Sequence, residues 1–320
     1  MKNNILYYSI GALLYCPANK KSIADSIINE RIGGNYSLAL CLEDSINDAC
    51  VQSAENDLIQ SIFQIYNARQ KKSFYLPKIF VRVRYPEQIV RLTKAFGSAV
   101  DVINGFILPK FSADNSTPYI QEIIKANELC RKKLFMMPIY ESSSMIDLRN
   151  RIELLYQLKE SLAKVEDLVL NIRVGGNDLC HMFGFRRHSD ESIHRIRPVS
   201  NIFSDIITVY GMDYVISGPV WEYYSGEHWK EGLLQEIKDD KLCGFTGKTV
   251  IHPNQISVVN HAYKVTRADF DDAQEILNWN RQSDAFVSGS HTKERMNEYK
   301  THTNWARQTL YLAEAFGILE

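Results

Sequence analysis

Short runs of apolar residues recur along the chain, with longer amphipathic stretches between them. The runs occupy residues 12–16, 37–42, 79–83, 105–108, 134–139, 168–174, 214–217 and 249–251. Each run is too short for a typical helix and shows little alternation of apolar and polar residues, which is typical of strands buried on both faces of a parallel sheet. The stretches between them carry apolar residues at helical spacing and are predicted to be helices, for example over 46–68, 86–96, 119–131 and 145–164.

Eight strand and helix units of about 40 residues each favour a (β/α)8 TIM barrel. A doubly wound open sheet is the alternative, but about six strands would suffice for it. Beyond Gln255 we find no further strand pattern, and helices are predicted over 267–283 and 303–315, with a polar segment over 284–293 between them. We therefore expect a barrel domain over residues 1–263 and a C-terminal helical appendage over 264–320.

Composition narrows the class of protein. The chain has 320 residues, of which 45% are hydrophobic, so it can bury a large core. Its 37 Lys and Arg nearly balance 38 Asp and Glu, which disfavours duplex nucleic acid as a partner. The apolar runs are far shorter than the roughly 20 residues of a membrane span, and the first residues lack the apolar stretch of a signal peptide. We expect a soluble, cytoplasmic protein with no membrane partner.

Polar residues follow most of the predicted strands, where the chemistry of a barrel is located. The candidate catalytic residues are Arg82, Glu43, Asp44 and Lys110; the candidate substrate-binding residues are Arg84, Gly176, Asn177, His252 and Asn19; the candidate metal ligands are Glu141 and Asp178. For His252, a structural role is as compatible with the sequence as a contact to substrate or cofactor. The glycine pair before Asn177 allows the backbone to approach a ligand closely, or simply makes a turn.

Glu141 and Asp178 follow two adjacent predicted strands, 37 residues apart. In a barrel their side chains would lie on opposite sides of one small cavity. Two carboxylates suit Mg²⁺ or Mn²⁺, which keep several waters that a chelating substrate can replace. The alternative is that both are solvated acids at the starts of loops.

Arg82 lies inside an apolar strand, where a buried cation needs an anionic partner. A substrate carboxylate could serve, and so could Glu43 or Asp44; the two interpretations are compatible. Arg186 and Arg187, by contrast, lie in a loop flanked by histidines, which we interpret as a solvated basic segment, with contact to an anionic ligand as the alternative.

Several motifs together resemble the HpcH/HpaI aldolase and citrate lyase beta subunit family over nearly the whole chain. Residues 247–255, GKTVIHPNQ, are similar to the family's GK-x-x-IHP-x-Q signature; 42–45 resemble its LEDA segment, 81–83 its VRVN, 108–110 its PK, and 176–179 its G-x-DL. The chain departs from the family pattern at Gly11, where an arginine is expected, and at Arg84, which replaces the asparagine of VRVN. These changes resemble a divergent branch of C-C bond lyase-like barrels found among tellurium-resistance and stress-response genes.

The resemblance implies a (β/α)8 barrel that forms a homo-oligomer, usually a trimer or hexamer. It also implies an Mg²⁺ ion held by Glu141 and Asp178, with Arg82 orienting the substrate. Family members cleave or form a carbon–carbon bond between an oxo acid and an acetyl-type or pyruvate-type enolate. Coenzyme A-dependent relatives carry an aspartate in the appendage where residues 296–298 offer only Glu298, so we name no coenzyme A thioester as substrate.

The leading hypothesis is an Mg²⁺-dependent C-C lyase or aldolase that acts on a small oxo or hydroxy acid. One alternative is a catalytically silent barrel that serves as an assembly subunit of a stress-response complex. Another is metal-dependent chemistry on a phosphorylated metabolite, held by Lys110, Arg84 and the Arg186–Arg187 loop. Apolar residues at helical spacing over 305–316 predict that the appendage packs on a neighbouring subunit or on its own barrel.

Overall fold

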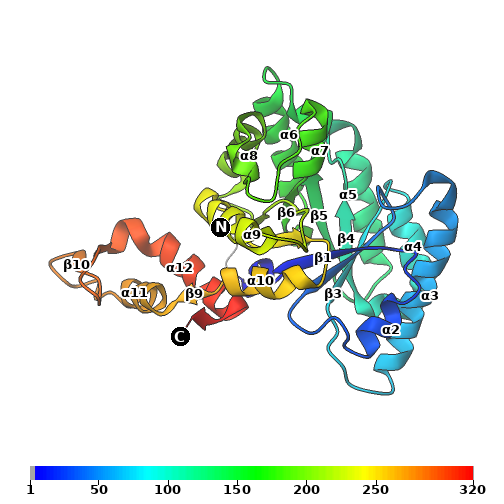
Figure 1. Cartoon of the computed structure of the whole chain (residues 1–320), viewed down its shortest axis with the longest axis horizontal. Helices are drawn as coiled ribbons and strands as arrows, with labels where there is room; N and C mark the ends of the chain where they lie inside the picture. The colour runs from blue at the N-terminus through cyan, green and yellow to red at the C-terminus, as the bar shows by residue number, and fades with distance from the viewer. Residues whose placement is uncertain (1–3, 320) are drawn as a thin grey trace.

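A computed structural model describes residues 4–319 and contains a barrel of eight parallel strands (Figure 1). The strands are β1 (Ala12–Pro17), β2 (Ser37–Cys41), β3 (Lys78–Arg82), β4 (Ile103–Leu108), β5 (Phe135–Tyr140), β6 (Ile172–Val174), β7 (Ile216–Ser217) and β8 (Lys248–Val250). They pair in the order β7-β6-β5-β4-β3-β2-β1-β8, and a bridge between Gly218 and Lys248 joins the two ends. The prediction of a (β/α)8 barrel is confirmed.

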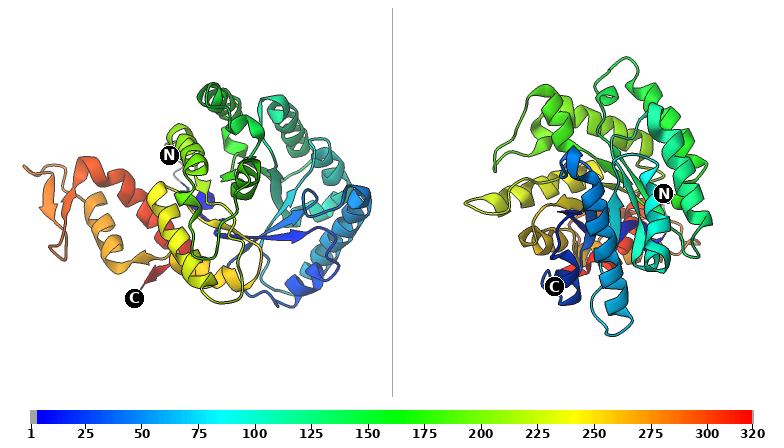
Figure 2. Two further views of the ribbon diagram at one scale, coloured as in Figure 1. Left: turned by 45° about the horizontal axis from the view of Figure 1, so that its top comes forward. Right: turned by 90° about the vertical axis from the view of Figure 1, so that its right-hand side faces the viewer.

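Helices follow the strands and cover the outside of the barrel, and one further short helix precedes the first strand (Figure 2). They are α1 (Ile5–Tyr8), α2 (Ile23–Ile28), α3 (Val51–Arg69), α4 (Gln88–Phe96), α5 (Ala113–Glu128), α6 (Arg151–Ala163), α7 (Gly176–Phe183), α8 (Arg197–Tyr210), α9 (Trp229–Cys243) and α10 (Asn254–Ala262). Short 3-10 turns occupy Asp48–Cys50, Gly97–Val102, Ser143–Met145, Glu166–Leu168 and Ile193–Arg195. Such turns precede α3, α6 and β6, and these elements begin at residues 51, 151 and 172, later than the predicted starts at 46, 145 and 168.

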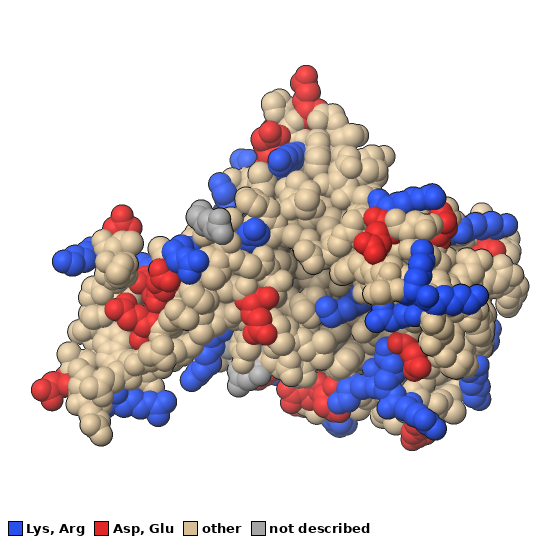
Figure 3. Space-filling model, turned by 90° about the horizontal axis from the view of Figure 1, so that it is seen from below, with Lys and Arg blue, Asp and Glu red and all other residues tan. Residues whose placement is uncertain are grey.

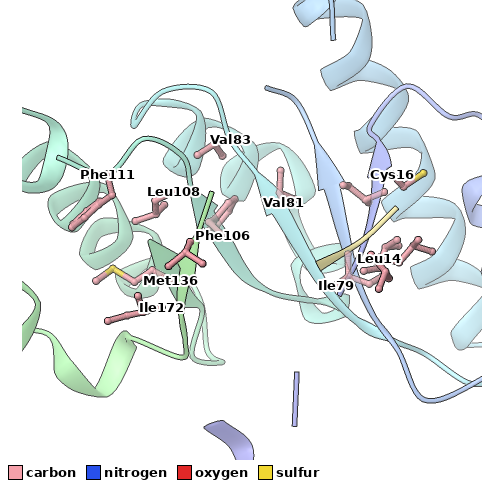
Figure 4. Packing of buried hydrophobic residues seen from close by; sticks show 14 of the residues in the cluster. Leu14, Cys16, Ile79, Val81, Val83, Phe106, Leu108, Phe111, Met136 and Ile172 are labelled. Carbon is pink, nitrogen blue, oxygen red and sulfur yellow. The ribbon is translucent and has the colours of Figure 1, made fainter. Parts of the chain in front are cut away.

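The strands bury apolar side chains on both faces, because alternate residues point inward and outward. Figure 4 shows outward-facing residues such as Val81, Phe106 and Leu108, which pack between the strands and the helices. A separate inner cluster, which includes Phe80 and Ile107, fills the barrel interior. This double burial explains the continuous apolar runs, and it leaves the polar side chains at the strand ends.

The appendage extends from one side of the barrel (Figure 1). It consists of β9 (Val265–Thr266), α11 (Arg267–Leu277), β10 (Val287–Gly289), β11 (Met296–Glu298), α12 (Tyr299–Phe316) and β12 (Ile318–Leu319). Ala273, Ile276 and Ala306 form a small core between α11 and α12. Helix α12 also contacts the barrel domain of the same chain, since Tyr311 of α12 stacks on Tyr8 of α1 with ring centroids 5.1 Å apart.

The two appendage helices are confirmed, but the expectation that no strand follows Gln255 is wrong. β10 and β11 form an antiparallel hairpin, and β9 pairs with β12. Each of these strands has only two or three residues, which is too short to show an alternating pattern. The β9 and β12 pair also joins segments about fifty positions apart, which only the tertiary fold brings together.

The surface carries both signs of charge. On the face in Figure 3, Lys and Arg side chains lie among Asp and Glu side chains over both the barrel and the appendage. Along residues 4–319, no helix combines the length and apolar character that crossing a membrane requires.

Candidate active site

A cavity of about 290 Å³ opens at the carboxyl ends of the barrel strands. Its lining residues are Tyr15, Asp44, Arg82, Ile139, Glu141, Arg173, Val174, Gly175, Gly176, Asn177, Asp178, Val220, Thr249 and Ile251. A cavity of about 320 Å³ lies at the amino ends of the strands, but Lys78 is the only charged residue among its described lining. Its place at the carboxyl ends of the strands, together with the buried charged groups in its lining, identifies the first cavity, hereafter the site cavity, as the candidate active site.

Arg82 connects three carboxylates at one wall of the site cavity. Its Nη2 lies 2.8 Å from Glu43 Oε2, 3.0 Å from Glu141 Oε1 and 3.3 Å from Asp44 Oδ2. These contacts confirm the ion pairs with Glu43 and Asp44 that the sequence allows, and they add Glu141. Burial opposes the charge of the guanidinium, but the facing carboxylates hold the pKa of Arg82 well above its usual range. Its Nε is buried without a hydrogen-bond partner in the described chain.

Lys110 lies just outside the cavity lining and supports the same carboxylates. Its Nζ contacts Glu43 and lies 3.1 Å from Asp44 Oδ1. Its backbone N–H donates to Glu141 Oε1 at 3.1 Å, from a residue with a positive φ of 50°. The positive φ is uncommon for a residue with a side chain, and here it turns the amide toward Glu141.

Glu141 and Asp178 line the site cavity from the ends of the adjacent strands β5 and β6. Glu141 is 4% exposed, and Asp178 is half-buried in the first turn of α7. Burial raises the pKa of Glu141 to about 7; Arg82 opposes the rise and the charge of Asp178 adds to it. A Cβ atom at Gly175 would lie 2.1 Å from Glu141 Oε2, so the absence of a side chain at this position makes room for Glu141. The glycine pair therefore has a packing function.

The two carboxylates fit a hard divalent cation. Asp178 forms no hydrogen bond or ion pair within residues 4–319, and its charge adds to the rise that burial causes in the pKa of Glu141. No cluster of three or more His, Cys, Asp or Glu side chains in this part of the chain could hold a metal ion. An ion here would take two carboxylates and complete its shell with water or substrate oxygens, as Mg²⁺ commonly does.

Two residues of the site cavity were not among the sequence candidates. Arg173 lies in β6, is 1% exposed and donates from Nη2 to Thr249 Oγ1 at 2.6 Å. Tyr15 lies in β1, with the Arg82 guanidinium 5.7 Å from its ring centroid. Burial raises the pKa of the Tyr15 hydroxyl although both arginines lower it, so the hydroxyl is neutral and can donate a hydrogen bond. Arg173 could have been found, because it interrupts an apolar strand just as Arg82 does.

Three predicted substrate-binding residues lie outside the cavity lining. Arg84 donates to backbone oxygens of the loop after β2, at 3.1 Å from Leu42, 2.8 Å from Glu43 and 2.7 Å from Ile46. His252 stacks on Tyr224 with ring centroids 4.6 Å apart, and Asn19 is exposed after β1. Gly176 and Asn177 do line the cavity. The structure therefore brings together the acidic candidates and Arg82, but not Arg84, His252 or Asn19.

A second cluster of buried charge, hereafter the α9 cluster, lies between β8 and α9. Lys248 Nζ lies 2.9 Å from Glu236 Oε1 and 2.6 Å from Asp240 Oδ2, and all three side chains are fully buried. Arg187 Nε lies 3.2 Å from Glu236 Oε2, and His194 Nε2 lies 2.7 Å from Asp240 Oδ1. The expectation that Arg187 belongs to a solvated segment is wrong, because it is 2% exposed and its charge has a buried partner.

The rest of the 247–255 motif is also structural. Gln255 is fully buried and accepts hydrogen bonds from the amides of Ile251 and His252, at 2.8 and 3.1 Å. Its amide group donates to the Trp221 and Tyr223 carbonyl oxygens, each at 2.9 Å. Gly247 has a φ of 74°, and a side chain there would lie 2.7 Å from the Gly11 oxygen. Most of the motif holds the end of the barrel closed, while Thr249 and Ile251 also line the site cavity.

Comparison with known proteins agrees with this fold. A family model for C-C bond lyases of the TIM-barrel fold matches residues 4–318. The citrate lyase subunit beta of Leuconostoc mesenteroides subsp. cremoris is 22% identical over 272 residues, which are 83% of this chain and 80% of that protein.

Two solved structures from Mycobacterium tuberculosis share the architecture at 18% sequence identity. The protein CitE in complex with magnesium, acetoacetate and coenzyme A has a TM-score of 0.60 and 18% identity, with 96% of this chain and 99% of that chain covered. The citrate lyase beta subunit complexed with oxaloacetate and magnesium has a TM-score of 0.51 and 18% identity, with 81% of this chain and 99% of that chain covered.

Proposed function

Because the chain belongs to the family of C-C bond lyases of the TIM-barrel fold, we propose that it cleaves or forms a carbon–carbon bond in a small oxo or hydroxy acid, with the help of a divalent cation. The observation that carries this proposal is the pair of carboxylates, Glu141 and Asp178, that lines the site cavity, where Asp178 has no ionic partner within residues 4–319. Two M. tuberculosis relatives were crystallised with magnesium and an oxo acid, which supports the choice of metal and of substrate class.

Glu141 and Asp178 would hold the cation, and we assign Mg²⁺ or Mn²⁺ because both prefer oxygen ligands. When bound, the cation would polarise the substrate carbonyl and stabilise the enolate charge that carbon–carbon cleavage produces. Arg82 and the Lys110 amide each contact Glu141 Oε1, at 3.0 and 3.1 Å, and so fix the direction of this ligand. Glu43 and Asp44 anchor Arg82 and Lys110 in turn.

Arg82 also lines the site cavity, so we propose that it orients the bound acid. Its Nη2 is already shared by three carboxylates, however, which limits how much of a substrate carboxylate it can neutralise. Gly176 and Asn177 would contact the substrate from the start of α7. Arg84, His252 and Asn19 would act only indirectly, through the loops that surround the cavity.

The phosphorylated-metabolite alternative has less support from the geometry. Its three proposed phosphate contacts do not converge: Lys110 binds Glu43 and Asp44, Arg84 binds the loop after β2, and Arg187 pairs with Glu236. We therefore retain the oxo or hydroxy acid as substrate. A homo-oligomer, trimer or hexamer, and a cytoplasmic location also remain proposals; light scattering on the full chain tests the first, and a monomer at micromolar concentration would contradict it.

The proposed function is tested by metal binding and turnover together. We expect calorimetry to detect one Mg²⁺ per chain, and we expect purified protein with Mg²⁺ to convert at least one acid in a panel of oxo acids, hydroxy acids and their thioesters. Asp178→Asn should weaken Mg²⁺ binding and lower turnover by at least about 100-fold, with little change in stability. Asp190→Asn, at an exposed acid outside the cavity, is the matched control. A protein that binds no divalent cation and converts no acid would favour the silent assembly subunit.

A further inference from the structure

Arg173 is the buried cation of the site cavity that has no acidic partner. Its Nη2 donates to Thr249 Oγ1 at 2.6 Å and its Nη1 to Asn171 Oδ1 at 3.4 Å. Both acceptors are neutral, and no carboxylate within residues 4–319 forms an ion pair with it. The residue is nevertheless 1% exposed and contributes to the lining of the cavity.

The other buried arginines of the described chain each have a carboxylate. Arg82 has three, Arg151 Nε lies 2.7 Å from Asp205 Oδ2, and Arg187 Nε lies 3.2 Å from Glu236 Oε2. A guanidinium cannot lose its proton at ordinary pH, so its burial without a counter-ion is energetically costly. Arg173 is therefore the exception, and it lies where a ligand can enter.

The surroundings of Arg173 are suited to an anion. Thr249 and Tyr15 place hydroxyl groups at the same cavity wall, and Arg173 presents a planar donor group that matches a carboxylate. Arg82 approaches the ring of Tyr15 within 5.7 Å, but its own charge is already balanced by Glu43, Asp44 and Glu141. Of the two cavity arginines, Arg82 is shared by three carboxylates, whereas Arg173 has no carboxylate partner within residues 4–319.

We propose that Arg173 binds a carboxylate of the substrate, and that the substrate is therefore a small dicarboxylic oxo or hydroxy acid. This inference rests on the proposed function, in which the Glu141 and Asp178 end of the cavity receives the oxo or hydroxy group and the first carboxylate. The second carboxylate then pairs with Arg173, the remaining uncompensated positive charge of the cavity. The role of Arg173 is to set specificity, because a monocarboxylic acid would leave it without a counter-ion.

The test compares two hydroxy acids that differ by one carboxylate. Lactate and malate, both enantiomers of each, are titrated into the full chain with saturating Mg²⁺, and binding is followed by calorimetry. We expect malate to bind at least about tenfold tighter than lactate, since a buried charge-assisted pair is gained. In Arg173→Met, malate affinity should fall by at least about tenfold while lactate affinity changes by less than about twofold. Arg186→Met, at an exposed arginine outside the cavity lining, is the control and should change neither.

Each outcome decides the proposal. Equal binding of lactate and malate by the native chain would overturn it, and so would an equal loss of both in Arg173→Met. If that variant does not fold, Arg173→Gln and the native-chain comparison provide the same decision. Tighter binding of 3-phosphoglycerate than of malate would assign Arg173 to a phosphate instead. Failure of the proposed function would give a different result. Malate would still bind more tightly than lactate because of Arg173, but no acid in the panel would be converted.

Discussion

The site cavity and the α9 cluster both contain buried charge on the same barrel, yet they differ in how that charge is partnered. In the α9 cluster the buried cations meet buried acids: Lys248 pairs with Glu236 and Asp240, Arg187 pairs with Glu236, and His194 Nε2 lies 2.7 Å from Asp240 Oδ1. In the site cavity Asp178 and Arg173 each lack an ionic partner in the described chain. Charge that is balanced within the chain holds the fold together, whereas charge left unbalanced at a cavity is available to a ligand.

The largest effect on stability is expected from Lys248→Met in the α9 cluster. The substitution leaves Glu236 and Asp240 fully buried without their common cation, so the free energy of unfolding should fall by about 3–5 kcal/mol. Urea unfolding followed by circular dichroism measures the change. Lys238→Met, at an exposed position of the same helix, should change it by less than about 0.5 kcal/mol. A loss below about 1 kcal/mol in Lys248→Met, the size expected for an exposed ion pair, would contradict the view that the α9 cluster stabilises the fold.

The second largest effect on stability is expected from Glu141→Gln in metal-free protein. The pKa of Glu141 rises from 4.5 to about 7 on folding, so the folded state binds the proton more tightly than the unfolded state does. The resulting stabilisation is present below pH 4.5 and is lost as the pH rises through 7. Glu141→Gln cannot ionise and should therefore be more stable than the native chain at pH 8 in EDTA, by a difference on the order of 3 kcal/mol.

The control for this pH prediction is Glu160→Gln, at an exposed acid on α6. Its unfolding free energy should follow that of the native chain at every pH. Saturating Mg²⁺ should remove the advantage of Glu141→Gln, because the cation stabilises only the chain with both carboxylates. An advantage that is equal at pH 4 and pH 8 would show that burial does not raise the pKa of Glu141.

The smallest effect on stability is expected from Arg173→Met. No acid loses a partner in this variant, and an apolar side chain replaces an unpaired buried cation, so the unfolding free energy should stay within about 1 kcal/mol of native or rise. The same urea unfolding measures it beside Lys248→Met. A loss of more than 3 kcal/mol would place Arg173 with the structural charges of the α9 cluster, by the size expected for breaking a buried pair.

The barrel was predictable because its strands are buried on both faces, which leaves runs of apolar residues that no loop or surface helix would carry. Residues 37–42 and 79–83 lie within one residue of β2 and β3 at each end. The acids of the site were predictable for a related reason, since a polar residue directly after such a run lies at the end of the barrel. Arg173 fits the same pattern as Arg82, an arginine inside an apolar strand, and this pattern alone is enough to make it a candidate site residue.

By itself the sequence determined where the strands lie and which charged residues follow or interrupt them, because burial imposes a pattern on neighbouring positions. Only the tertiary structure decided which of those charges are balanced. Arg187 meets Glu236 from 49 positions away, and Arg82 meets Glu141 from 59 positions away. Arg84 and Arg173 look alike in sequence, but one is held by loop carbonyls and the other faces the site cavity. Pairing depends on distances of a few ångströms between side chains, which local sequence does not encode.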